Sequence, residues 1–103
     1  MINVFYQDEY IKCKPLVTDD GELRTVLNIL HDIDSSKDLD LCKIGSSIFS
    51  IIPGHTHDLT PVQIQALANL GYVILNALSS ENYHISREHL SEKIFLIFFQ
   101  SVE

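Results

Sequence analysis

The sequence predicts a mainly α-helical protein, a single-domain bundle of about four or five helices. Hydrophobic residues recur along most of the chain at the spacing of one helix face. Helix-starting residues precede these stretches, and only four glycines and three prolines are present. A chain of 103 residues, 46% of them hydrophobic, is long enough to bury one core. We therefore expect residues 1–103 to form one domain.

The segment 1–17 fits two structures. Its hydrophobic and aromatic residues suit a β-strand by type, but their spacing also fits a short helix. These residues are Val4, Phe5, Tyr6, Tyr10 and Ile11. Pro15 ends either element because proline lacks the backbone N–H that a helix or a central strand requires. The sequence predicts a short strand or a short helix here.

A helix is expected from Asp19 to about His31. Asp19 lies three residues before Glu22, which is the spacing of a capping box. Its hydrophobic face consists of Leu23, Val26, Leu27 and Leu30.

A second helix is expected from about Ser36 to Ile52. Leu41, Ile44, Ile48 and Ile52 form its hydrophobic stripe. The run Gly45-Ser46-Ser47 has low helix propensity, which predicts a kink or break there. Pro53-Gly54 ends this helix.

The third helix has the strongest start signal. Thr60 is expected as N-cap, Pro61 takes the first helical position and Gln63 completes the capping box. Leu59 and Ile64 are placed to form a hydrophobic staple. The predicted apolar face is Ile64, Leu67, Ala68, Gly71, Ile74, Leu75 and Leu78, and the run Ser79-Ser80-Glu81-Asn82 ends the helix. Glycine inside a helix costs about 1 kcal/mol relative to alanine, so Gly71 predicts close approach of a neighbouring helix.

The fourth helix is expected from Arg87 to Gln100, with Ser86 as its N-cap. Leu90, Ile94, Ile97 and Phe98 provide its hydrophobic stripe. A buried strand over Ile94–Phe99 is the rival interpretation, because the length and residue types allow it. The continuous pattern from the cap onward favours a helix.

The charge balance bears on the choice of partner. Fourteen acidic and seven basic residues give a formal charge of −7. This disfavours nucleic acid and anionic membranes as partners and favours a basic protein.

The N-terminal residues do not form a signal peptide, and no apolar run is long enough to span a membrane. Cys13 and Cys42 form no CxxC pair and are expected as reduced thiols in or near the core. We therefore expect a cytoplasmic protein.

Acidic residues alternate in the segment 32–40. The spacing of Asp32, Asp34, Asp38 and Asp40 approaches that of a calcium-binding EF-hand loop. Lys37 stands where such a loop requires glycine, and Lys43 stands where it requires glutamate. Two other interpretations remain, namely acids that complement the dipole of a helix N-terminus and a negative patch that binds a basic partner. Asp32, Asp34, Asp38 and Asp40 are therefore the candidate partner-binding residues.

The segment 54–58 contains two histidines, His55 and His57, and Asp58. The metallohydrolase pattern HxHxDH would need aspartate and histidine where Leu59 and Thr60 stand. Zinc could bind there only if other histidines, His31, His84 or His89, converged on them. The sequence also contains no GxSxG motif and no phosphate-binding glycine loop. Neither catalytic residues nor a cofactor or metal are expected.

A small, acidic, single domain without catalytic motifs resembles the bacterial immunity proteins. The resemblance extends over the whole chain and is nearest to the immunity proteins of contact-dependent growth inhibition systems, and looser to the colicin immunity proteins. It implies a non-enzymatic protein that binds a cognate basic toxin, such as a nuclease, and covers its active site. The alternatives are an inhibitor encoded by a phage or plasmid, a small adaptor protein and, third, a small metal-dependent enzyme.

Overall fold

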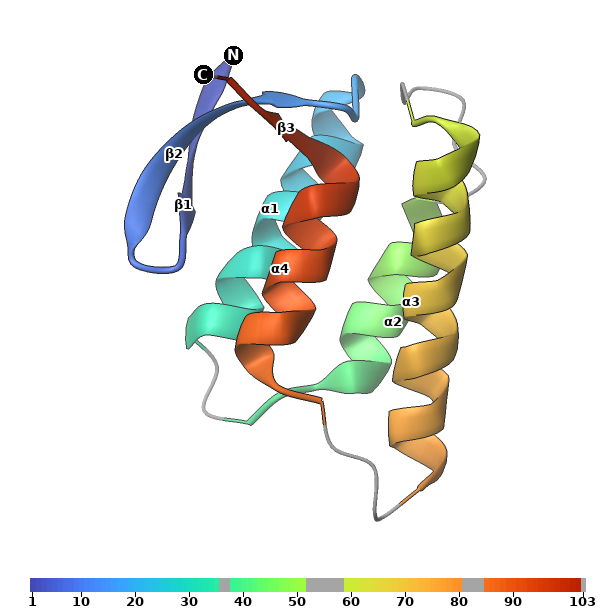
Figure 1. Cartoon of the computed structure of the whole chain (residues 1–103). Helices are drawn as coiled ribbons and strands as arrows, with labels where there is room; N and C mark the ends of the chain where they lie inside the picture. The colour runs from blue at the N-terminus through green and yellow to red at the C-terminus, as the bar shows by residue number, and fades with distance from the viewer. Residues whose placement is uncertain (36–37, 52–58, 81–84, 103) are drawn as a thin grey trace.

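The computed structural model describes residues 1–35, 38–51, 59–80 and 85–102. Over these residues the chain forms four helices and one three-stranded sheet (Figure 1). The elements in order are β1 (Ile2–Tyr6), β2 (Glu9–Pro15), α1 (Asp20–Ser35), α2 (Leu41–Ile51), α3 (Pro61–Ser79), α4 (Arg87–Phe98) and β3 (Phe99–Ser101). The mainly helical expectation is confirmed, but the fold is not a pure bundle. None of the described helices has the length and hydrophobicity to cross a membrane.

The N-terminal segment forms a β-hairpin, so its strand interpretation is confirmed and the helix interpretation is wrong. Strands β1 and β2 pair antiparallel around a two-residue turn at Gln7 and Asp8, and the sheet order is β1-β2-β3. Both turn residues have positive φ, 49° and 66°, as a type I′ turn requires. Val4, Tyr6 and Cys13 are buried, which gives the hairpin one core-facing side.

Helix α1 begins as predicted but ends later. The N–H of Glu22 donates to the Asp19 carboxylate at 3.0 Å, which confirms the cap. The helix continues past His31 to Ser35 because Ile33, which is fully buried, extends its core-facing stripe by a further turn.

Helix α2 starts at Leu41 rather than Ser36. The Asp40 carboxylate accepts from the N–H of Lys43 at 3.0 Å and so caps the helix. The expected break at Gly45-Ser46-Ser47 is wrong, since α2 runs unbroken to Ile51. A Cβ at Gly45 would lie 3.3 Å from the Ile74 side chain, so this glycine serves close packing against α3. The expected end at Ile52 and Pro53-Gly54 lies outside the described residues.

Helix α3 has the predicted bounds and both hydrogen bonds of the capping box between Thr60 and Gln63. Its buried face differs in part from the prediction. Ile64, Leu75 and Leu78 are 41%, 50% and 45% exposed, whereas Leu67, Leu70, Gly71 and Ile74 are buried. The core-facing stripe is narrower than predicted because α2 and α4 cover only one side of α3.

Helix α4 starts at the predicted cap, where Ser86 accepts from the N–H of His89 at 3.1 Å. It ends at Phe98 instead of Gln100, and the chain turns into β3. Phe99 has extended backbone angles and pairs with Pro15 of β2. The rival strand over Ile94–Phe99 is therefore wrong for all but its last residue.

The helices α1 and α4 lie side by side between the sheet and the pair α2 and α3 (Figure 1). Aromatic rings attach the hairpin to α4. Tyr6 stacks on Phe95 with ring centroids 4.4 Å apart, and Phe95 stacks on Phe99 at 5.3 Å. A hollow lined by β1, the hairpin turn, α1 and α4 lies beside this attachment.

Candidate partner-binding groove

A cavity of about 900 Å³ lies between the hairpin, the last turns of α1 and the first turns of α4. We call it the hairpin groove. Its apolar residues include Val4, Leu27 and Leu30. Its charged and polar residues include Gln7, Asp8, His31, Asp34, Ser35, Arg87 and Glu88. One of the four predicted partner-binding residues, Asp34, therefore lines this groove.

The carboxylates of the groove come from three elements that are distant in the sequence. Asp8 lies in the hairpin turn, Asp34 in the last turn of α1 and Glu88 in the first turn of α4. The guanidinium of Arg87 also lines the groove, and it donates to the backbone carbonyl of Ile33 at 2.8 Å. Arg87 thereby satisfies a carbonyl that the end of α1 leaves without a helical partner.

The environment of Asp34 disfavours its negative charge. Partial burial raises the pKa of the Asp34 carboxyl, the Asp8 carboxylate raises it further, and His31 opposes both effects. The last turn of α1 contains no basic residue, so the negative end of the helix dipole adds to the cost of this charge. Burial also raises the pKa of Tyr6, and the charges of Glu92 and Asp34 raise it further. Asp34 itself is exposed, and its carboxylate lies in the groove with those of Asp8 and Glu88 and with the cation of Arg87.

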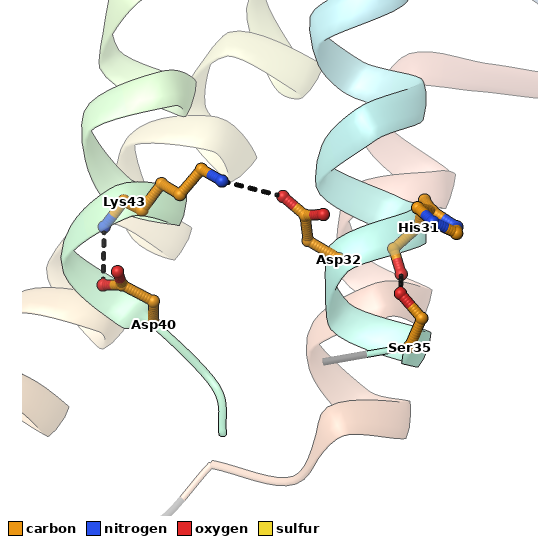
Figure 2. A network of polar contacts seen from close by, with 5 residues as sticks. All are labelled: His31, Asp32, Ser35, Asp40 and Lys43. Carbon is orange, nitrogen blue, oxygen red and sulfur yellow. Dashed lines mark hydrogen bonds and ion pairs between the residues drawn. The ribbon is translucent and has the colours of Figure 1, made fainter. Parts of the chain in front are cut away.

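Asp32 and Asp40 lie elsewhere, beside Lys43. The Lys43 ammonium is 3.4 Å from the Asp32 carboxylate, while the Lys43 backbone N–H donates to Asp40 (Figure 2). Both side chains of the ion pair are solvent-exposed, at 68% for Lys43 and 38% for Asp32, so the pair contributes little stability. Asp38 is exposed in the connection between α1 and α2. The four predicted residues therefore do not form one continuous patch.

The helix-dipole interpretation of the same acids holds for Asp40 and fails for Asp32 and Asp34. Asp40 stands at the N-terminus of α2, where a negative charge is favourable. Asp32 and Asp34 stand instead in the last turn of α1, where a negative charge is unfavourable.

The remaining candidates are the histidines of a possible metal site and the two cysteines. His55, His57, Asp58 and His84 lie outside the described residues. In the described part of the chain, no three histidine, cysteine, aspartate or glutamate side chains are close enough to hold a metal ion. Cys13 is a free thiol in the core, and burial raises its pKa. Cys42 is also a free thiol but is exposed, contrary to the expectation for it.

The sequence analysis missed Asp8 and Glu88. The available signal was the dipeptide Gln7-Asp8, which separates two runs of strand-forming residues by the length of a tight hairpin turn. Such turns favour asparagine and glycine, and neither is present, so the turn went unrecognised.

In comparisons with known proteins, no family model, no curated protein and no solved structure matches this chain. The functional argument therefore rests on the residues and geometry of the hairpin groove.

Proposed function

We propose that this protein is an immunity protein that binds a basic toxin domain through the hairpin groove and neutralises it without catalysis, in the cytoplasm. The observation that carries the proposal is that several features which destabilise the free protein lie together at one end of the groove. Asp34 places a negative charge at the C-terminal end of α1, where the helix dipole disfavours it, and the Asp8 carboxylate is nearby. The hairpin turn at the same end contains no glycine, although both of its residues have positive φ. Proteins retain such costs most often at sites selected for binding.

A cation from a partner would offset the electrostatic part of these costs. An arginine or lysine that enters between Asp8 and Asp34 separates two like charges and forms charge-assisted hydrogen bonds. The formal charge of −7 also accelerates encounter with a basic domain at low ionic strength. Both effects favour a positively charged protein surface as the ligand.

A nuclease toxin fits this requirement because its active site presents lysine and arginine to the phosphates of its substrate. Carboxylates that occupy the same groups exclude the substrate by competition. Inhibition then requires only binding, which agrees with the absence of catalytic motifs from the sequence.

The proposal is tested by co-expression. Each protein encoded beside the gene of this chain is induced alone in a sensitive bacterial host and then together with this chain. We expect one of them to stop growth and this chain to restore it. If no neighbouring protein is toxic, or if toxicity persists on co-expression, the proposal is wrong.

Two charge reversals on α1 connect the function to the groove. Asp34→Lys should abolish protection, because it replaces an acidic groove residue with a cation. Asp32→Lys is the matched control, since Asp32 is two residues away and faces Lys43 instead. Circular dichroism must show both variants folded. Equal protection by the two variants would remove the groove from the proposal.

The adaptor alternative is supported by a second hollow of about 370 Å³ between α3 and α4. Its lining includes Val62 and Leu96, which are 78% and 62% exposed, together with Ala66 and Val73. Exposed apolar surface of this kind is typical of protein-protein contacts. If the hairpin groove is the inhibitory site, the double variant Val62→Glu, Leu96→Glu should still protect against the toxin. If the hollow between α3 and α4 is the inhibitory site, the double variant should lose this protection.

A further inference from the structure

Strand β1 is an edge strand with one side unpaired. The sheet order places β2 on one side of β1, and no strand of the described chain lies on the other. The two-residue turn makes Tyr6 and Glu9 a hydrogen-bonded pair, and such pairs alternate along an antiparallel ladder. Val4 therefore bonds to β2, while the N–H and C=O groups of Asn3 and Phe5 point away from it.

These outward-pointing groups border open space. Outside the strand ladder, no hydrogen bond joins a described residue to the backbone of Asn3 or Phe5. Asn3, Val4 and Phe5 line the hairpin groove, whose volume of about 900 Å³ is sufficient for a short extended segment. A further strand would lie about 4.8 Å from β1, on the side where the groove is located.

The charges and the apolar lining of the groove indicate which segment fits. Leu27 and Leu30 lie in the middle of α1, whereas Asp34 lies near its end together with Asp8 of the hairpin turn. An extended segment along β1 would thus meet apolar side chains over part of its length. Near the turn it would meet three carboxylates and one cation, Arg87, whose guanidinium donates to the Ile33 carbonyl. This arrangement suits alternating apolar and basic residues.

From this geometry we infer that the hairpin groove binds an extended basic segment of a partner protein as an additional strand on β1. The segment forms main-chain hydrogen bonds with Asn3 and Phe5, and its lysine or arginine side chains contact Asp8 and Asp34. A second copy of this chain is disfavoured as the occupant, because its charge of −7 would bring like charges together. The inference rests on the proposed function for the identity of the partner and specifies how that partner binds.

The test uses a short capped peptide in which lysine alternates with valine. On titration into ¹⁵N-labelled protein, the amide signals of Asn3 and Phe5 should shift, and their hydrogen exchange should slow. Two further peptides carry backbone N-methyl groups, one on every lysine and the other on every valine. Because successive residues of a strand point their N–H groups to opposite edges, one methylated peptide should lose about tenfold in affinity and the other should bind unchanged. Equal losses would show binding by charge alone and overturn the inference.

Proline variants test the same edge in the protein. Asn3→Pro removes an outward N–H from β1 without breaking the pairing with β2, and should weaken peptide binding about tenfold. Ser101→Pro is the matched control at the opposite edge. The N–H of Val102 donates to Lys12, so that of the preceding Ser101 points outward. Equal effects of the two variants would contradict strand addition at β1.

The peptide experiment and the co-expression experiment fail independently. In one outcome this chain restores growth, but the peptide leaves the amide signals of Asn3 and Phe5 unchanged. That outcome would retain the immunity function and reject strand addition. Specific peptide binding at β1 without any toxin to neutralise would retain the strand-addition site and reject the immunity function. Light scattering would detect a dimer at the concentrations used. A dimer that forms through β1 would make a second copy of this chain the occupant of the groove and overturn the inference.

Discussion

Gly71 of α3 lies at the tip of the Phe49 ring of α2, so that a Cβ at Gly71 would be 2.8 Å from the ring's Cζ atom. The sequence analysis expected close approach of a neighbouring helix at this glycine, and the contact with Phe49 confirms it. The absence of a side chain here allows α2 and α3 to pack with the phenylalanine ring between them.

The effect of Gly71→Ala should depend on Phe49. Alone, it should change the stability by less than about 1 kcal/mol, because the exposed Phe49 ring can turn away and the gain in helix propensity offsets the cost of that movement. In a Phe49→Ala background the clash is absent, and the same substitution should stabilise the protein by about 1 kcal/mol. Urea unfolding of the four proteins in the cycle measures both effects. The same change in both backgrounds would show that the ring does not restrict position 71.

Asp40 is expected to contribute as a cap rather than through its charge. Asp40→Asn keeps an oxygen that accepts from the N–H of Lys43, and it should leave stability within about 0.5 kcal/mol. Asp40→Ala removes the acceptor and should cost about 1 kcal/mol. Thermal or urea unfolding separates the two variants. The Asp40→Asn variant should neutralise the toxin as well as the unmodified chain does. A loss of neutralisation would show that Asp40 belongs to the binding surface.

The stability gained from Asp34→Asn should depend on pH. The pKa of Asp34 is raised in the folded protein, so folding favours its protonated form. Below the unfolded-state pKa, both states bind the proton and the substitution should change little. The gain appears as pH rises through the interval up to the folded-state pKa and is constant above it. Because Asp34 is partly solvated, we expect a plateau below about 1 kcal/mol.

Asp8→Asn provides the control for this pH dependence. Part of the raised pKa of Asp34 comes from the Asp8 carboxylate, so the effect of Asp34→Asn should shrink in the Asp8→Asn background. Asparagine tolerates the positive φ of position 8, which keeps the turn intact. An undiminished effect would assign the pKa shift to burial alone.

Gln7→Gly should stabilise the hairpin. Gln7 has φ of 49°, which strains any residue with a Cβ, and glycine removes this strain. After allowance for the greater entropy of glycine in the unfolded chain, we expect a gain of about 0.5 to 1 kcal/mol. Lys12→Gly, in the middle of β2, is the matched control and should destabilise the protein. A loss of stability in Gln7→Gly would show that the turn is not under strain.

Local signals in the sequence were sufficient to locate the starts of three helices, α1, α3 and α4. The caps at Thr60 and Ser86 act within one turn, so they are visible without knowledge of the rest of the fold. The end of α4 depends instead on pairing of Phe99 with Pro15, which the sequence between them does not reveal. The residue types of segment 1–17 fit a strand or a helix for a related reason, since the packing of Tyr6 on Phe95 is a contact between residues distant in sequence.

The candidate site was predicted only in part. Asp34 was named from the alternation of acids, but residues two apart on a helix project about 200° from one another. Asp32 and Asp34 therefore cannot share a surface once both belong to α1. Asp8 and Glu88 reach the groove from the hairpin turn and from α4, so their proximity to Asp34 arises only from tertiary structure.

The position of β2 between β1 and β3 also affects how the protein folds. Cys13 of β2 pairs with Ile2 on one side and with Ser101 on the other, so the sheet joins residues from nearly the whole described chain. Contacts between residues so distant in sequence are slow to form, because most of the chain must lose conformational entropy before the hydrogen bonds between these strands can offset the loss. We therefore expect refolding to be slower than that of an all-helical bundle of this size, with closure of the sheet as the event that sets the rate.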